Sequence, residues 1–154
     1  MALLVKALDT AIWEMGEAFK GLTDEDVWRR AHPRLLSVGE LAAHVAFWEG
    51  QSFFGDQGVD SPLATAAARY YSTNSDAPFT LDLGAEAVYE EVKSIHAKCK
   101  AFFEAEPHDS EEKNANRGEA TWGWTLEYQG FHVAYHTGQM YSVRHLMGHE
   151  TVDN

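Results

Sequence analysis

The sequence predicts an all-α protein, namely an antiparallel four-helix bundle with a short extra helix in the connection that spans residues 55–80. Four segments repeat apolar residues every three or four positions, which places those residues on one face of a helix. The alternation of Val, Ile and Thr that a β-sheet requires is absent. A chain of 154 residues can bury a core, so residues 1–154 are expected to form a single helical-bundle domain.

The first two predicted helices cover about residues 2–21 and 38–54. Gly21 ends the first helix, whose apolar face consists of Leu4, Leu8, Ile12, Met15 and Phe19. The second helix begins with a capping box, in which the side chains of Ser37 and Glu40 each satisfy a backbone N–H that the helix leaves without a partner. Its inward face consists of Leu41, Val45 and Trp48.

The third predicted helix covers about residues 83–105, and the fourth begins near Thr125 and ends at Gly148. The apolar face of the third consists of Val88, Val92, Ile95, Cys99, Phe102 and Phe103. The 55–80 connection is rich in Gly, Asp, Ser and Thr, but a favourable helix start, Ser-Pro, occurs within it. We therefore expect a short helix through residues 63–71.

The net charge of −12, from 24 acidic and 12 basic residues, argues against nucleic acid and anionic membranes as partners. Binding to phosphates needs clustered Lys and Arg, and the sequence has no such cluster. No apolar run approaches the roughly 18 residues of a membrane span, and the opening residues lack the features of a signal peptide. A cytoplasmic location is therefore expected. The single cysteine, Cys99, is expected to be a small buried side chain rather than a nucleophile.

The fourth predicted helix carries His132 and His136, which are four residues apart and therefore share one helix face. Two imidazoles at this spacing can reach one divalent metal ion, and a third ligand should come from another helix. His44 is the best candidate because it borders the inward face of the second helix, and His96 is the reserve candidate. Such a pair also occurs in helices that bind no metal, so a hydrogen-bonded core or surface role stays open.

The segment between the two histidines lacks the glutamate of the zinc-protease motif H-E-x-x-H, because Val133 occupies that position. This argues against protease activity. If water is activated for hydrolysis, the base could be Glu40 or Glu49 of the second helix. The alternative roles are a capping partner for Glu40 and a solvated surface carboxylate for Glu49.

Three aromatic residues neighbour the candidate ligands along the helices: Trp48, Tyr128 and Tyr135. They could form the wall of a substrate pocket or fill the core, since aromatic residues at helical spacing are usually core residues. Gly130 and Gly138 bracket the histidine pair, and each costs about 1 kcal/mol of helix stability relative to alanine. Close helix packing and room for a ligand beside the metal both explain them.

Two segments, SVGELAAHVAFWE (Ser37–Glu49) and HVAYHTGQM (His132–Met140), resemble the signature segments of the DinB/YfiT-like superfamily. The order of elements is similar too, with LTDEDVW following the first helix. The resemblance implies a four-helix bundle with a divalent metal ion bound by three histidines, here His44, His132 and His136. It also places Gln139 where its side chain could orient a ligand or a bound water.

Characterised members of this superfamily include bacillithiol S-transferases and a mycothiol-dependent maleylpyruvate isomerase, and homodimers are common among them. The resemblance thus implies a metal ion, zinc or nickel, that activates a low-molecular-weight thiol or water for transfer to a small-molecule electrophile. An S-transferase or a hydrolase-like enzyme that forms a homodimer is expected. Two alternatives stay open: a non-enzymatic metal-binding bundle of the stress response, and a metal-free helical module that binds a protein or an apolar ligand.

Overall fold

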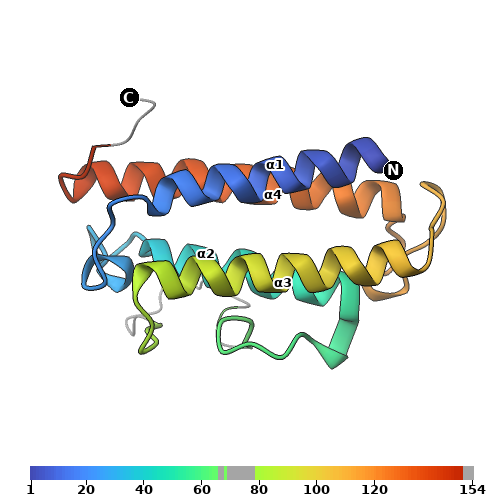
Figure 1. Ribbon diagram of the computed structural model, residues 1–154, viewed down its shortest axis with the longest axis horizontal. Coiled ribbons are helices and arrows are strands. Elements are labelled where there is room, and N and C mark those ends of the chain that lie inside the picture. The colour runs from blue at the N-terminus through green and yellow to red at the C-terminus, as the bar shows by residue number, and fades with distance from the viewer. Residues whose placement is uncertain (66–67, 69–78, 151–154) are drawn as a thin grey trace.

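The computed structural model describes residues 1–65, 68 and 79–150, which contain four long helices (Figure 1). These are α1 (Ala2–Phe19), α2 (Val38–Phe54), α3 (Ala85–Ala105) and α4 (Trp122–Leu146). Short 3-10 helices lie in the connections: η1 (Asp26–Trp28), η2 (Gly55–Gln57) and η4 (Ala115–Arg117). The described residues contain no strand, and their only β-bridge joins Lys113 to Thr121. The all-α prediction is confirmed.

The helix boundaries follow local capping interactions. The predicted capping box starts α2: the Glu40 N–H donates to Ser37 Oγ at 3.2 Å, and the Ser37 N–H donates to Glu40 Oε2 at 2.8 Å. The fourth helix begins three residues earlier than predicted, because the Thr121 side chain accepts a hydrogen bond from the Trp124 N–H. The short helix predicted through 63–71 lies mostly outside the described residues, and residues 63–65 within it form bends.

The helices form two layers, with α1 beside α4 and α2 beside α3 (Figure 1). Within the first layer both helices run in the same direction. Glu14 of α1 accepts a hydrogen bond from Tyr141 of α4. One turn later in both helices, the carbonyls of Glu17 and Ala18 accept hydrogen bonds from Arg144.

The helices of the second layer are also parallel. Glu49 of α2 contacts His96 of α3, and further toward the C-terminal end of both helices Phe53 of α2 packs against Phe103 of α3. Between the layers, α1 opposes α3 and α2 opposes α4. The antiparallel arrangement predicted for the bundle is therefore not confirmed as a whole, because the helices inside each layer run in the same direction. Parallel neighbouring helices such as α2 and α3 need a long crossover connection, and residues 55–84 separate the two helices in the sequence.

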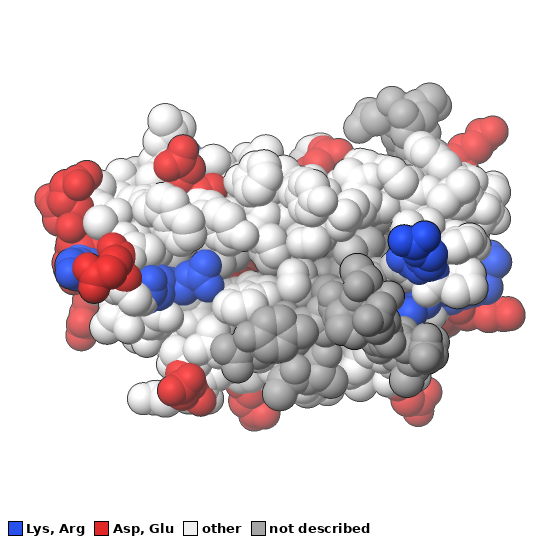
Figure 2. All heavy atoms as spheres, turned by 180° about the vertical axis from the view of Figure 1, so that it is seen from behind, with Lys and Arg blue, Asp and Glu red and all other residues white. Residues whose placement is uncertain are grey.

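The core lies between the layers and contains apolar residues from all four helices. Cys99 is fully buried in it, and burial raises the pKa of its thiol, so it is a small buried side chain as predicted. No helix in the described part of the chain has both the length and the hydropathy that crossing a membrane requires. On the face drawn in Figure 2, Lys and Arg lie in separate small groups and form no stripe.

Candidate metal centre

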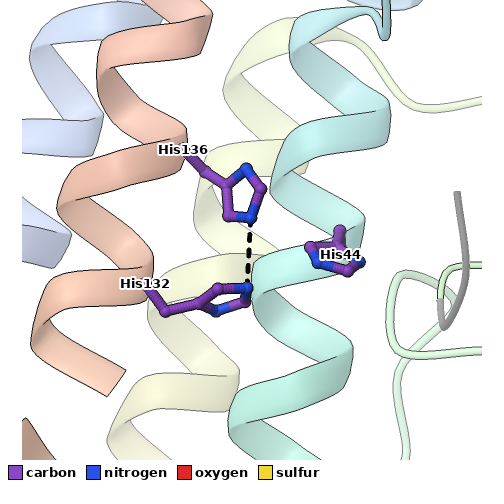
Figure 3. A group of neighbouring side chains, drawn as sticks. All are labelled: His44, His132 and His136. Carbon is purple, nitrogen blue, oxygen red and sulfur yellow. Dashed lines mark hydrogen bonds between the residues drawn. The ribbon is translucent and has the colours of Figure 1, made fainter. Parts of the chain in front are cut away.

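The antiparallel pair α2–α4 brings three histidines together, one from α2 and two from α4 (Figure 3). His44, His132 and His136 each offer one ring nitrogen, and these nitrogens lie within 4.8 Å of one another. The Nε2 atoms of His132 and His136 are 3.1 Å apart. Both α4 histidines are buried and His44 is half-buried. Within the described residues no other group of histidine, cysteine or carboxylate side chains has a geometry that could hold a metal ion.

Hydrogen bonds orient two of the three rings. His44 Nδ1 lies 3.1 Å from the carbonyl oxygen of Ala68, and His136 Nδ1 lies 2.7 Å from Gln139 Oε1. An amide oxygen only accepts, so each Nδ1 carries the proton and each Nε2 keeps a lone pair for a metal ion. His132 Nδ1 is buried and has no hydrogen-bond partner in the described structure. Because His136 Nε2 carries no proton, the 3.1 Å hydrogen bond makes His132 Nε2 the donor in the metal-free protein, and a metal ion would take the place of this proton.

The environment keeps all three rings neutral. Burial lowers the pKa of His44 to about 4. Burial lowers the pKa of His132 to about 3, and the neighbouring His136, His44 and Arg117 lower it further. The pKa of His136 is also lowered by burial, against the hydrogen bond to Gln139. Because a metal ion binds only the neutral imidazole, this environment prepares the three rings for metal binding at pH 7.

The three predicted pocket residues each lie against one histidine of the triad. The Tyr128 ring stacks on His132 at 5.8 Å with an interplanar angle of 14°. The Tyr135 ring meets His136 edge-on at 5.1 Å, and the Trp48 ring meets His44 edge-on at 6.4 Å. Tyr128 and Tyr135 are 37% and 54% exposed, so they flank the triad at the surface and do not fill the core.

Gln139 was expected to orient a ligand or a bound water. In the structure its Oε1 accepts from Nδ1 of His136, a candidate metal ligand, and its Nε2 donates to the Tyr135 hydroxyl at 3.3 Å. A Cβ atom added at Gly130 or Gly138 would meet no other described atom within 4 Å. Among the described residues, close helix packing therefore does not explain these two glycines.

Neither candidate base on α2 has a carboxylate available to the triad, because each is bound to another residue. Glu40 completes the capping box and pairs with Arg30. Burial alone would raise the pKa of Glu40, but the hydrogen bonds from Arg30, Ser37 and Phe79 overcome burial and lower the pKa. Glu49 was expected to be solvated, and this was wrong: it is fully buried.

Glu49 is buried because α3 supplies a partner for it. Its Oε1 lies 2.7 Å from Nδ1 of His96, whose Nε2 lies 2.9 Å from Asp9 Oδ1. The reserve ligand His96 is therefore bound between two carboxylates and does not join the triad. Burial alone would lower the pKa of His96, but these carboxylates raise it.

Sequence reasoning missed two residues beside the triad. Trp124 stacks on Tyr128 with ring centroids 4.8 Å apart. The spacing of four residues between Trp124, Tyr128 and His132 is the signal that could have revealed it. Arg117 lies near enough to His132 for its charge to lower the pKa of that ring. Nothing in the polar loop around Arg117 indicated this position.

Comparison with known families identifies the chain. The sequence profile described as mycothiol-S-transferase matches residues 3–148. Comparison with curated proteins and with solved structures gave no significant match. The profile covers all four helices and the three triad histidines, and it agrees with the superfamily resemblance of the two signature segments. The chain therefore belongs to the mycothiol-S-transferase family, within the DinB/YfiT-like superfamily.

Proposed function

We propose that this protein is a divalent-metal-dependent thiol S-transferase in which His44, His132 and His136 bind the metal ion. The observation that carries the proposal is the convergence of three neutral imidazoles, with ligand atoms within 4.8 Å of one another. The family description supports mycothiol as the thiol, and the acceptor is a small-molecule electrophile.

The donor set suits a catalytic ion. Three protein ligands leave a coordination position open, whereas structural zinc sites use four. Imidazole ligands are compatible with zinc or nickel. An ion bound here would lower the pKa of a coordinated thiol, so that it is a thiolate at neutral pH.

The chain's own residues then have three tasks. Burial keeps the triad rings neutral, and Ala68 and Gln139 turn two Nε2 atoms toward the shared point. Tyr128 and Tyr135 flank the triad, where they can contact the thiol and the electrophile. No described carboxylate belongs to the group, which favours a nucleophile that needs no general base over a water that does.

The test combines metal content with transferase activity. The chain is purified without a histidine tag, its metal is measured by elemental analysis, and conjugation of mycothiol to a panel of electrophiles is assayed. We expect about one metal ion per chain and an activity that a chelator removes and added metal restores. His136→Ala should lose both metal and activity while its circular dichroism stays helical.

His145→Ala is the matched control, because His145 is an exposed histidine on the same helix. It should keep metal and activity. Stoichiometric metal with no thiol transfer would support the non-enzymatic metal-binding bundle instead. Absence of metal, with a melting temperature that the chelator leaves unchanged, would support the metal-free module.

We also propose that residues 1–154 form one domain, that the protein is a cytoplasmic homodimer, and that its substrates are small molecules. The superfamily resemblance supports these points, and the contacts between both helix layers support the single domain. Light scattering coupled to size exclusion tests the dimer.

A further inference from the structure

Arg117 lies in a cage of three aromatic rings at the edge of the triad. Its guanidinium carbon is 5.4 Å from the centre of the Trp48 ring, and 5.8 Å from the centres of both the Trp124 and the Tyr128 rings. The side chain is half-buried, so part of it stays accessible to solvent. Attraction between a guanidinium and ring faces can hold such a side chain in place.

The loop that carries Arg117 is fastened to α2 by two side-chain amides. Asn114 is fully buried and donates to the Ser52 carbonyl at 2.9 Å and to Thr125 Oγ1 at 3.2 Å. Asn116 donates to the Phe53 carbonyl at 2.9 Å. These bonds join η4 to the end of α2 and the start of α4. The position of Arg117 is therefore set by the same two helices that carry the triad.

No carboxylate among the described residues pairs with Arg117, although the chain carries a net charge of −12. Other arginines differ: Arg29 pairs with Asp26, and Arg30 pairs with Glu40. The rings contact the guanidinium only through weak cation–π attraction. They cannot satisfy its five N–H donors as oxygen atoms do. Within the part of the chain that the structure describes, Arg117 thus presents a fixed positive charge whose N–H donors are not all used.

The cage connects Arg117 to the triad through shared rings. Tyr128 contacts Arg117 and also stacks on His132. Trp48 contacts Arg117 and also meets His44 edge-on. An anionic group bound to Arg117 would therefore be separated from the triad by no more than one aromatic ring, that of Trp48 or Tyr128. This separation suits a small substrate whose charged end and reacting carbon are close together.

We propose that Arg117 binds a carboxylate of the electrophile, so that the preferred acceptors of this transferase are electrophiles that carry a carboxylate near the reacting carbon. A planar carboxylate matches the paired donors of one guanidinium. The inference rests on the proposed function, because it assigns a substrate class to the same site. In the reaction, the thiolate sulfur forms a bond to the acceptor carbon, the bond to the leaving group breaks, and the thiol proton passes to solvent.

The first experiment compares chloroacetate with chloroacetamide as acceptors for mycothiol in the metal-loaded enzyme. The two differ only in the carboxylate, and each releases chloride as the S–C bond forms. Arg117→Gln should lower kcat/KM for chloroacetate by about 10- to 100-fold, the size expected for a lost charged hydrogen-bond pair. Its kcat/KM for chloroacetamide should stay within about twofold, and Arg117→Lys should fall between wild type and Arg117→Gln.

Arg34→Gln is the matched control, because Arg34 is exposed in a loop of the described structure. It should leave both acceptors unaffected. Equal losses for both acceptors in Arg117→Gln would overturn the proposal and leave Arg117 a structural role only. A second arm compares N-acetylcysteine with N-acetylcysteamine as thiols. The proposal is wrong if Arg117→Gln lowers the activity with N-acetylcysteine more than with N-acetylcysteamine but affects chloroacetate and chloroacetamide equally. Arg117 would then bind the carboxylate of the thiol.

A binding measurement separates failure of this inference from failure of the proposed function. Acetate is titrated against the metal-free protein, and the arginine Nε–Hε signals are followed by NMR. One signal, absent from Arg117→Gln, should shift with acetate and stay unmoved with acetamide. This result would stand even if no thiol transfer were found. An Arg117 signal unmoved by acetate would overturn the inference while leaving the triad untouched.

Discussion

Two histidines of this protein, His136 and His96, have the same exposure, 9%, and opposite electrostatic environments. His136 meets two other imidazoles and an amide, and its pKa is lowered. His96 meets two carboxylates, and its pKa is raised. Burial is therefore not what separates the two sites. The neighbours decide whether a buried imidazole is a neutral ligand or a charged partner.

The largest effect is expected from removing the imidazole that lies between the two carboxylates. His96→Ala leaves Glu49 fully buried without its partner, which should lower the free energy of unfolding by about 3–5 kcal/mol. Urea denaturation at pH 7 measures it, with exposed His145→Ala as the control. A loss no greater than that of the control would contradict an ionised pair at this site.

The next effect belongs to the triad side. Zinc or nickel at about 100 times its dissociation constant should raise the free energy of unfolding of the wild type by about 2.7 kcal/mol. His44→Ala removes one of the three ligands and should lose most of this gain. Glu49→Gln should keep the gain, because Glu49 contacts His96 and not the triad. If Glu49→Gln lost the metal effect as well, the two sites would not be independent.

The two sites should also give the metal-free protein pH dependences of opposite sign. The pKa of His96 in the folded protein is raised above 6.5. Its contribution to the free energy of unfolding is therefore complete below pH 6.5 and is lost as the pH rises through the folded pKa. The pKa values of His44 and His132 are lowered to about 4 and about 3. The contribution of these two histidines to the free energy of unfolding is complete above pH 6.5 and is lost as the pH falls from 6.5 toward those values.

Urea unfolding in the presence of a chelator, across this pH range, measures both limbs. One group changes the free energy of unfolding by up to about 1.4 kcal/mol per pH unit. Glu49→Gln should flatten the alkaline limb only, and His132→Ala should flatten the acid limb only. A variant that flattened both limbs would show that the environments are coupled.

The smallest effect tests the space beside the triad. Gly138→Ala should raise the free energy of unfolding by about 0.5–1 kcal/mol, because alanine favours the helix and the added Cβ meets no described atom within 4 Å. If the space serves a ligand, the same variant should raise KM for the acceptor. Thermal melting and steady-state kinetics measure the two effects. A destabilised variant would mean that the position is packed after all.

The sequence was most informative where the cause is local. The Ser37–Glu40 capping box lies within one turn, so the start of α2 could be predicted to the residue. The i, i+4 spacing on α4 likewise predicted that His132 and His136 share a face. The position of His44 beside the inward face of the second helix indicated the third member, and the superfamily resemblance implied the same residue.

It was least informative where the cause lies on another helix. Glu49 is buried because α3 supplies His96, and no pattern within α2 reveals a partner 47 residues away. Arg117 is in a polar loop, and its ring partners come from α2 and α4. The parallel direction within each layer depends on how the connections run, which helical periodicity does not encode.

Arg144 explains how two helices of the same direction can lie side by side. The C-terminal ends of α1 and α4 are adjacent, and each helix dipole places partial negative charge there, so the two ends repel. Arg144 is 2% exposed and donates to the carbonyls of Glu17, Ala18 and Glu150. Arg144 also belongs to the last turn of α4, so its positive charge offsets part of the negative charge at the ends of both helices. The same side chain therefore stabilises α1 and α4 lying side by side in the same direction.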